Sequence, residues 1–235
     1  IARDVGDQLR AEEIERELGK MEFVNLIAHE LRNPLAAISG AVQFLADDRE
    51  AIREDKRPLV DLLVRQVNRS QSLINDLLDL SRLQSGKFNV SLEAVPLDAA
   101  LGDALLASPA PEGKQVDLEV PSDLGVVADP VRLQQVFTNL LTNAYKYGGP
   151  SISVHAAHSK NVVEVSFADN GRGLPDDYVE QVFDPFVRGE TAGQTGSGLG
   201  LAITKGLVEA QGGSIRYEAV EPQGARFVCT LKVPA

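Results

Sequence analysis

The sequence predicts an α plus α/β architecture: a helical hairpin that pairs with a second copy into a four-helix bundle, followed by a two-layer α/β sandwich. Glycine and proline are scarce up to Gly86 and frequent after it, which marks a domain boundary near that residue. Before the boundary, apolar residues recur at helical spacing. After it, alternating β-like stretches are interspersed with helical patterns, as in a sheet covered by helices.

Composition narrows the class of protein. The 235 residues are 43% hydrophobic and 24% charged, which is typical of a globular protein. The formal net charge of −11 disfavours nucleic acid and anionic lipid as partners. The single cysteine, Cys229, lies in an alternating stretch and is interpreted as a reduced core residue. No run is long and apolar enough for a membrane span, so we expect a cytoplasmic chain. Because it begins with Ile1, we also expect upstream sequence, which could anchor the full-length protein in a membrane.

Residues 1–20 are charged with few apolar positions, and we interpret them as a helical lead-in from an upstream sensory domain. Residues 21–86 are predicted to form the hairpin, with Pro58 suited to the start of its second helix. A lone hairpin encloses too little core, so we expect a homodimer. The two predicted stripes are Ile27, Leu31, Leu35, Ile38, Val42 and Leu45 in the first helix, and Leu63, Val67, Ser70, Ile74, Leu77 and Ser81 in the second.

Residues 87–235 are predicted to form the second domain. Alternating stretches predict five strands, at 116–120, 151–154, 163–167, 214–217 and 226–231. Helical patterns lie between them, at about 97–107, 129–147, 175–182 and 199–211.

His29 is the first candidate for chemistry. At ~100° per residue it lies about 200° from Ile27, away from the apolar stripe, so we expect it to be exposed. Pro34 removes a helix hydrogen bond and bends or loosens the helix nearby. Glu30 adjoins the histidine and Asn33 lies one turn on. An exposed imidazole that a carboxylate keeps basic suits a nitrogen nucleophile. A surface histidine beside an incidental kink explains the same pattern.

Asn139, Asn143 and Lys146 repeat on one face of the helix predicted over 129–147. An amide oxygen suits Mg²⁺, and a lysine ammonium suits a phosphate. A solvated helix face is the alternative. Such faces usually favour Glu and Lys, however, and asparagine is a poor helix former, so the pair indicates a use.

Asp169, Gly171 and Gly173 come directly after a predicted strand. A carboxylate could accept a hydrogen bond from an exocyclic amine such as that of adenine, and glycines let the backbone approach the ring. On its own, this pattern is more often a plain turn.

A second glycine-rich segment, Gly196, Gly198 and Gly200, opens a predicted helix whose free amides attract phosphate. Residues 183–195 carry two aromatic residues and then glycines, which predicts an anchored, mobile lid whose Arg188 could reach a phosphate.

In order and spacing, these five motifs resemble those of a bacterial sensor histidine kinase of two-component signalling. Residues of about 20–86 look like its dimerisation and histidine phosphotransfer domain. Residues of about 90–235 look like its catalytic ATP-binding domain, of the gyrase, chaperone, histidine kinase and mismatch-repair superfamily. The resemblance implies autophosphorylation from Mg-ATP and transfer of the phosphoryl group to an aspartate of a response regulator receiver domain.

The resemblance also implies roles for single residues. His29 matches the phosphorylated histidine, and Glu30 the acid that assists as general base. Many members have threonine where this chain has Asn33; because asparagine can also orient water, phosphatase activity is kept as a further expectation. The asparagine box of the family is matched by Asn139, Asn143, Lys146 and Tyr147; in it, Asn143 is the Mg²⁺ ligand and Tyr147 flanks the nucleotide.

The remaining motifs follow along the chain. Asp169 matches the aspartate that reads adenine, and Gly171 and Gly173 match the glycines after it. Arg188 matches the lid-side arginine, and the second glycine box is matched by Gly196, Gly198 and Gly200.

Three other functions compete with this one. A serine-directed kinase of the same superfamily would lack the segment around His29. A DNA-acting, gyrase-like ATPase is disfavoured by the net charge of −11 and the short chain. A signalling scaffold that binds nucleotide without turnover stays open, although every expected polar residue is present.

Overall fold

The structure is a computed structural model that describes residue 28 and residues 31–47, 52–187 and 197–234. The chain divides into two compact units, Ile1–Lys87 and Phe88–Ala235. The predicted lead-in over residues 1–20 and the candidate residues His29, Glu30, Arg188 and Gly196 lie outside the described residues.

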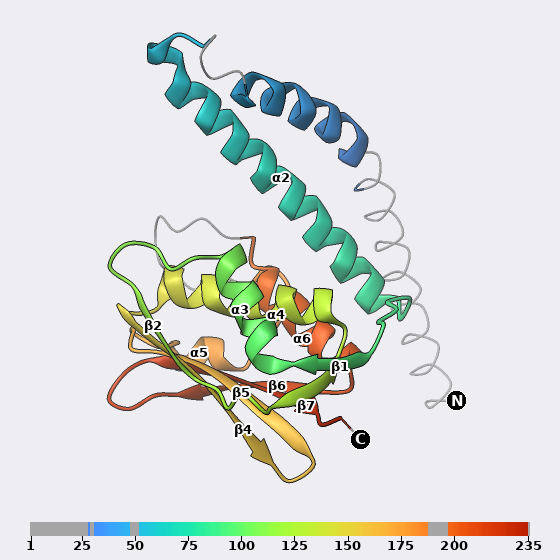
Figure 1. The fold of residues 1–235 in the computed structure, drawn as a ribbon, viewed down its shortest axis with the longest axis vertical. Helices are drawn as coiled ribbons and strands as arrows, with labels where there is room; N and C mark the ends of the chain where they lie inside the picture. Colours follow the sequence, from blue (N-terminus) through green and yellow to red (C-terminus); the bar gives the residue numbers. More distant parts are fainter. Residues whose placement is uncertain (1–27, 29–30, 48–51, 188–196, 235) are drawn as a thin grey trace, which may run out of the picture. The chain divides into compact units, whose positions relative to one another are not determined.

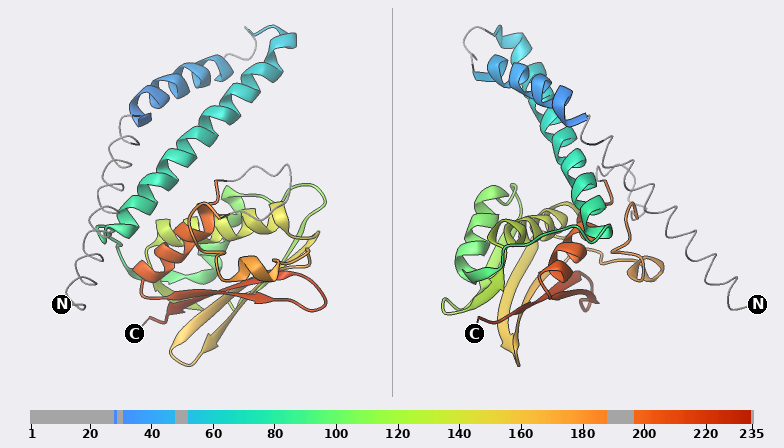
Figure 2. Two further views of the ribbon diagram at one scale, coloured as in Figure 1. Left: turned by 180° about the vertical axis from the view of Figure 1, so that it is seen from behind. Right: turned by 90° about the vertical axis from the view of Figure 1, so that its right-hand side faces the viewer.

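The first unit contains the predicted helical hairpin. One helix covers residues 31–47 and continues through Pro34. After the short 3₁₀ helix η1 (Glu54–Lys56) comes α2 (Arg57–Gln84), which has a proline in its first turn as predicted. The two helices run side by side in opposite directions (Figures 1 and 2). The Arg32 Nη2 donates a hydrogen bond of 2.9 Å across the hairpin to the Asn75 Oδ1.

The hairpin buries only part of its apolar surface. Val42 and Val67, one from each predicted stripe, are buried. Many other apolar side chains of the hairpin stay 38–75% exposed; they are Leu31, Ile38, Phe44, Leu45, Leu59, Leu62, Leu63 and Leu73. A single copy of the described hairpin therefore leaves a long apolar surface open to water.

The second unit is built on a seven-stranded sheet. Its path of neighbours is β1-β3-β7-β5-β4-β2, and β6 also pairs with β7. The paired strands are antiparallel except for β2 and β4, which are parallel. The five predicted strands are present, whereas β1 and β3 were not predicted. The strands are β1 (Glu93–Pro96), β2 (Gln115–Glu119), β3 (Gly125–Ala128), β4 (Ser151–Ser159), β5 (Val162–Asp169), β6 (Ser214–Ala219) and β7 (Ala225–Lys232).

Helices α3, α4 and α6 cover one face of this sheet, which confirms the two-layer sandwich (Figures 1 and 2). The predicted helix at 175–182 is reduced to one short turn, α5. The helices are α3 (Leu97–Ala107), α4 (Pro130–Tyr147), α5 (Asp176–Val179) and α6 (Gly200–Ala210).

Local sequence explains why α4 begins where it does and which face it buries. The Asp129 side chain accepts hydrogen bonds from the first-turn amides of Val131 and Arg132, and a proline occupies the first turn. The predicted stripe of Val136, Leu140 and Ala144 is buried. Next to it, the ring of Phe137 packs 5.5 Å from that of Phe167 in β5. The opposite side of α4 is left for polar residues.

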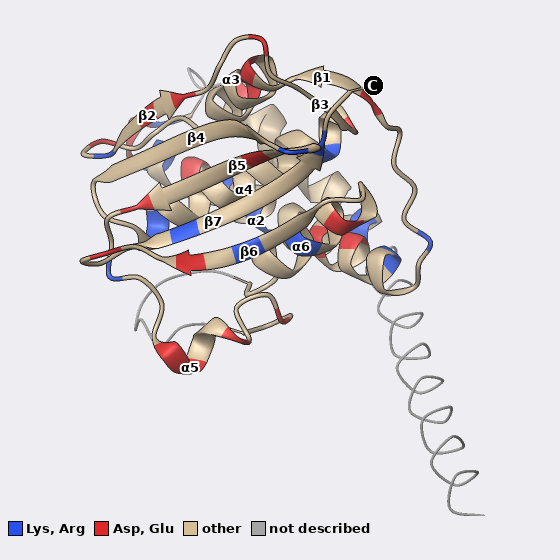
Figure 3. Cartoon of the chain, turned by 90° about the horizontal axis from the view of Figure 1, so that it is seen from below, with Lys and Arg blue, Asp and Glu red and all other residues tan. Residues whose placement is uncertain are grey.

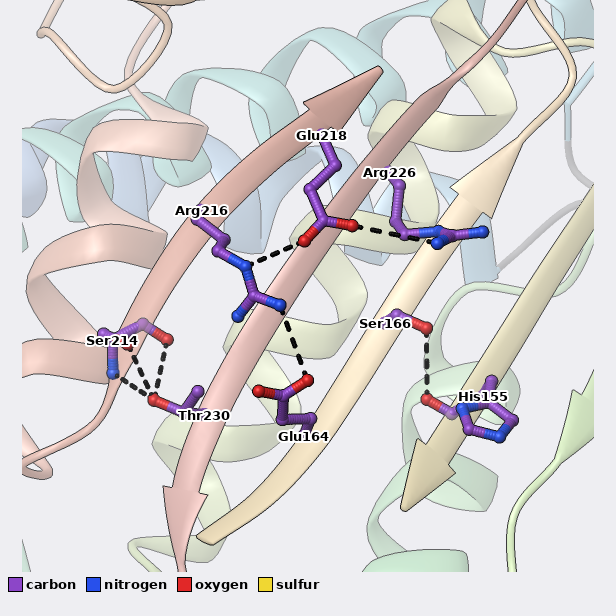
Figure 4. Close-up of polar contacts among 8 residues, drawn as sticks. All are labelled: His155, Glu164, Ser166, Ser214, Arg216, Glu218, Arg226 and Thr230. Carbon is purple, nitrogen blue, oxygen red and sulfur yellow. Dashed lines mark hydrogen bonds and ion pairs between the residues drawn. The ribbon is translucent and has the colours of Figure 1, made fainter. Parts of the chain in front are cut away.

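Charged residues lie along the strands of the sheet (Figure 3), and several of their side chains stand on the face away from the helices (Figure 4). Arg216 on β6 pairs with Glu164 on β5 at 3.4 Å and with Glu218 at 2.8 Å, and Arg226 on β7 lies 3.7 Å from Glu218 (Figure 4). These ion pairs link three neighbouring strands on the face that the helices leave uncovered.

Candidate functional site

Asn139 of helix α4 faces α6, and Asn143 follows it one turn later on the same side of α4. Asn139 and Asn143 are half-buried. The Asn139 Nδ2 lies 3.5 Å from the hydroxyl of Thr204, a buried residue of α6 that donates to the Gly200 carbonyl at 2.8 Å. The asparagine face of α4 therefore lies next to the helix that Gly200 opens.

Asp169 ends β5, and its carboxylate is held by backbone groups. The Gly171 amide donates to the Asp169 Oδ1 at 2.7 Å. Burial raises the pKa of this carboxyl above its ordinary value. Backbone hydrogen bonds from Gly171, Ala225 and Gly149 and the positive charge of Lys114 act in the opposite direction, so they lower the pKa. The result is a half-buried, oriented acceptor that can receive a hydrogen bond from an amine.

Glycines bring the end of α4 against the segment that follows β5. A Cβ atom on Gly148 would lie 2.6 Å from the Asp169 Cβ, and a Cβ on Gly171 would lie 2.8 Å from the Gly148 Cα. Gly173 has a φ of +71°, and a Cβ there would lie 2.8 Å from the Gly224 carbonyl oxygen. The packing of the protein itself therefore requires glycine at these three positions.

The end of α4 is also where Lys146 and Tyr147 are exposed, Tyr147 by 51%. The same helix end contacts Asp169 through Gly148. The structure thus brings Tyr147, Asp169 and Gly171 to one end of the sandwich.

The second glycine-rich segment begins with a tight contact. Gly198 has a φ of +72°, and a Cβ there would lie 2.9 Å from the backbone carbon of Phe186. The Phe186 amide donates to the Gly198 carbonyl at 2.9 Å. Phe186, whose φ is +66°, exposes 61% of its surface. Gly200 differs, because a Cβ there would meet nothing within 4 Å.

In the hairpin unit, Asn33 is exposed on the first helix. A cavity of about 320 Å³ lies between the two helices; its lining residues are Arg32, Leu35, Gln71, Ile74 and Asn75.

The sequence patterns did not point to Lys114, which contacts the end of α4. The Lys114 ammonium, just before β2, donates to the carbonyls of Gly148 at 2.7 Å and Gly149 at 2.9 Å. These partners lie 34 and 35 residues away in the sequence, so no local pattern could have pointed to them.

Among the described residues, no group of three His, Cys, Asp or Glu side chains could hold a metal ion. Amide oxygens such as those of Asn139 and Asn143 have the chemistry to bind Mg²⁺. In the same part of the chain, no helix has the length and apolar character needed to cross a membrane.

Fold and site together define a class of protein: a helical hairpin followed by a two-layer α/β domain with polar and glycine-rich segments at one end. Residues 128–235 match the family model "Histidine kinase-, DNA gyrase B-, and HSP90-like ATPase", and residues 20–86 match "His Kinase A (phospho-acceptor) domain". The chain belongs to the sensor histidine kinases of two-component systems.

Curated relatives agree with this assignment. The chain is 33% identical over 230 residues to "Autoinducer 2 sensor kinase/phosphatase LuxQ" of Vibrio parahaemolyticus, covering 91% of this chain and 26% of that protein. It is 32% identical over 213 residues to "Sensor histidine kinase ZraS" of Escherichia coli O157:H7, covering 88% of this chain and 45% of ZraS. The chain thus spans less than half the length of these relatives.

Solved structures are similar as well. Full-length ShkA in complex with AMPPNP superposes with a TM-score of 0.73 and 29% identity, covering 91% of this chain and 46% of ShkA. Acinetobacter baumannii histidine kinase AdeS has a TM-score of 0.62 at 22% identity, covering 88% of this chain and 98% of that one, and supports the fold alone.

Proposed function

We propose that this chain transfers the γ-phosphoryl group of ATP to His29, and from there to an aspartate of a response regulator receiver domain. One observation carries the proposal: a phospho-acceptor hairpin and a histidine kinase-type ATPase domain are joined in one chain.

Asp169 reads the base. Its carboxylate, held by the Gly171 amide, accepts a hydrogen bond from the 6-amino group of adenine. Gly171 and Gly173 keep the neighbouring backbone free of side chains, and the exposed ring of Tyr147 flanks the nucleotide.

The phosphates lie between α4 and α6. Asn143, with Asn139 one turn away, offers an amide oxygen to Mg²⁺, which neutralises charge on the triphosphate when it is bound. Lys146 and Arg188 supply positive charge. The first-turn amides of α6, opened by Gly196, Gly198 and Gly200, donate to phosphate oxygens. The open space beside Gly200 supports this role, because protein packing does not require glycine there.

In the transfer step, a ring nitrogen of His29 attacks the γ-phosphorus in line while the bond to the ADP oxygen breaks. Glu30 accepts the imidazole proton, so the new N–P bond forms on a neutral ring. The receiver aspartate then takes the phosphoryl group. For the phosphatase function, the exposed amide of Asn33 orients a water that attacks the phosphoryl group on the receiver aspartate, which releases inorganic phosphate and frees the aspartate.

The chain acts as a homodimer, because pairing of two hairpins covers the apolar surface left open on one. In this arrangement residues 21–86 form the dimerisation and phosphotransfer domain and residues 87–235 the catalytic domain. Residues 1–20 connect them to an upstream sensory domain.

The test is to incubate the chain with Mg²⁺ and γ-labelled ATP and to challenge the bound label with acid and alkali. We expect label that is lost in acid and kept in alkali, as for phosphohistidine. His29→Gln should abolish labelling while ATP still binds, and Asn143→Ala should abolish labelling while the dimer persists. His155→Gln is the matched control; it removes an exposed histidine on the outer sheet face and should label normally.

Three outcomes would contradict the proposal. Acid-stable label would indicate a hydroxyl acceptor, as in a serine-directed kinase. A chain that binds ATP but neither becomes labelled nor dephosphorylates a regulator would be a scaffold. Label retained in His29→Gln would place the acceptor elsewhere.

A further inference from the structure

Lys114 connects the start of β2 to the end of α4. Its half-buried ammonium donates two hydrogen bonds to consecutive carbonyls, those of Gly148 at 2.7 Å and Gly149 at 2.9 Å. Next to it, the Gln115 amide donates to the Pro150 carbonyl at 2.8 Å. Because carbonyls at a helix C-terminus lack partners within the helix, a charged donor there strongly favours one backbone geometry.

The turn that Lys114 holds lies directly against the proposed base-reading carboxylate. A Cβ on Gly148 would lie 2.6 Å from both Cβ and Cγ of Asp169, and a Cβ on Gly149 would overlap the side chain of Asn170. The Asn170 Oδ1 in turn accepts from the Ser151 amide at 3.0 Å. The turn therefore cannot shift toward β5 without moving the Asp169 side chain.

Lys114 also acts on Asp169 through its charge. Among the groups that affect this carboxyl, burial raises the pKa and is opposed by three backbone hydrogen bonds and by the positive charge of Lys114. Lys114 therefore acts in two ways: the turn that it holds restricts the orientation of the Asp169 side chain, and its charge favours the ionised carboxylate.

We propose that Lys114 is a positioning residue for base recognition, which holds the Gly148–Gly149 turn so that the Asp169 carboxylate faces the 6-amino group of the purine. This inference rests on the proposed function, since it deepens the role given to Asp169. Lys114 acts through the turn and the carboxylate and does not itself touch the base.

The test compares affinities of the full chain for ATP and for purine riboside triphosphate, which lacks the 6-amino group. The wild type should bind ATP more tightly. Lys114→Met keeps the aliphatic stem but removes the charge and both donors, so its ATP affinity should fall about tenfold while affinity for the analogue changes little. Lys114→Arg should restore most of the preference for ATP. Lys160→Met, which removes an exposed lysine from the β4–β5 turn, is the charge-matched control and should keep the full preference for ATP.

The possible results separate this inference from the function beneath it. If the wild type does not prefer ATP, both the role of Asp169 and that of Lys114 are wrong. If the wild type prefers ATP and Lys114→Met keeps the same preference, only the positioning role is wrong. The same holds if Lys114→Met lowers the affinity for ATP and for the analogue by the same factor. Should Lys114→Met fail to fold in a thermal melt, Lys114→Gln replaces it, because its side chain is uncharged and shorter than that of lysine. An unreduced preference in that variant would equally overturn the proposal.

Discussion

At Asp169 the requirements of folding and of binding conflict. Burial raises the pKa of its carboxyl despite the opposing hydrogen bonds, so the ionised form costs free energy in the folded protein. A group whose folded pKa is raised contributes stability below its unfolded pKa, and this contribution is lost as the pH rises through the folded pKa. The negative charge of Asp169, which suits a hydrogen bond from an amine of the ligand, therefore lowers the free energy of unfolding.

Asp169→Asn separates these two effects. Because asparagine does not titrate, the free energy of unfolding of the variant minus that of the wild type should increase between about pH 4 and pH 7. Affinity for ATP should fall at least tenfold, because the side-chain NH₂ group of asparagine can face the 6-amino group of adenine, and two donors cannot form a hydrogen bond. Urea unfolding at the two pH values and a nucleotide titration measure both. A stability difference that shrinks with pH would contradict the assigned direction of the pKa shift.

Single residues differ in how far the sequence reveals them. Asp169 follows an alternating strand and precedes two glycines, so its position at a strand end could be predicted, and the structure places it there. Lys114 could not be found, because its role depends on carbonyls brought close only by the fold. The role of His29 stays a prediction, since that residue lies outside the described ones.

At the scale of elements, two glycines of the same segment are present for different reasons. Gly198 has a positive φ and contacts the Phe186 backbone, whereas Gly200 lies in the first turn of α6 beside open space. Gly198→Ala should destabilise the second unit by about 1–2 kcal/mol.

Gly200→Ala should leave stability unchanged or raise it by up to about 1 kcal/mol, because alanine is the better helix former. It should nevertheless weaken ATP binding, since the new methyl group would occupy space beside the first-turn amides. Thermal melts with and without ATP distinguish the two variants. Equal destabilisation by both would show that the segment responds only to protein packing.

The outer face of the sheet gives a prediction with little expected effect. Glu218 accepts from Arg216 and lies near Arg226, yet all three side chains are more than a third exposed. Water and salt screen such pairs, so Glu218→Gln should lower the free energy of unfolding by less than about 1 kcal/mol. Its ATP affinity should equal that of the wild type, because the helices cover the opposite face (Figure 3). A loss of ATP affinity would place part of the site on the wrong side of the sheet.

Elements were predictable where they are long and regular. The predicted helix at 97–107 and the five alternating strands are present. Each of these elements has one side more buried than the other, so apolar residues recur in its sequence with the period of a helix or a strand. The strands β1 and β3 show no alternation of apolar and polar residues, since β3 is Gly-Val-Val-Ala, and β1 ends in a proline. Their pairing, with Glu93 opposite Ala128, arises only when distant segments meet.

For the whole molecule, the two units differ in what they need to be stable. The second unit has a continuous core between sheet and helices, including the fully buried Phe137, Leu140 and Ile152. The described hairpin instead exposes a row of large apolar side chains. The hairpin should therefore depend on its partner, whereas residues 88–235 should fold alone and melt at a temperature independent of protein concentration.

Ile38→Glu tests this dependence. Ile38 is 52% exposed on the predicted stripe, so a carboxylate there would be buried without a partner in the proposed four-helix bundle. Sedimentation equilibrium should show a dimer for the wild type and mostly monomer for the variant. Gln43→Glu adds the same charge about 140° around the helix and should stay dimeric. Because the core of residues 88–235 is separate, ATP binding should survive in both variants. A dimeric Ile38→Glu protein would mean that another surface joins the two copies, and the open stripe of the hairpin would then need a different occupant.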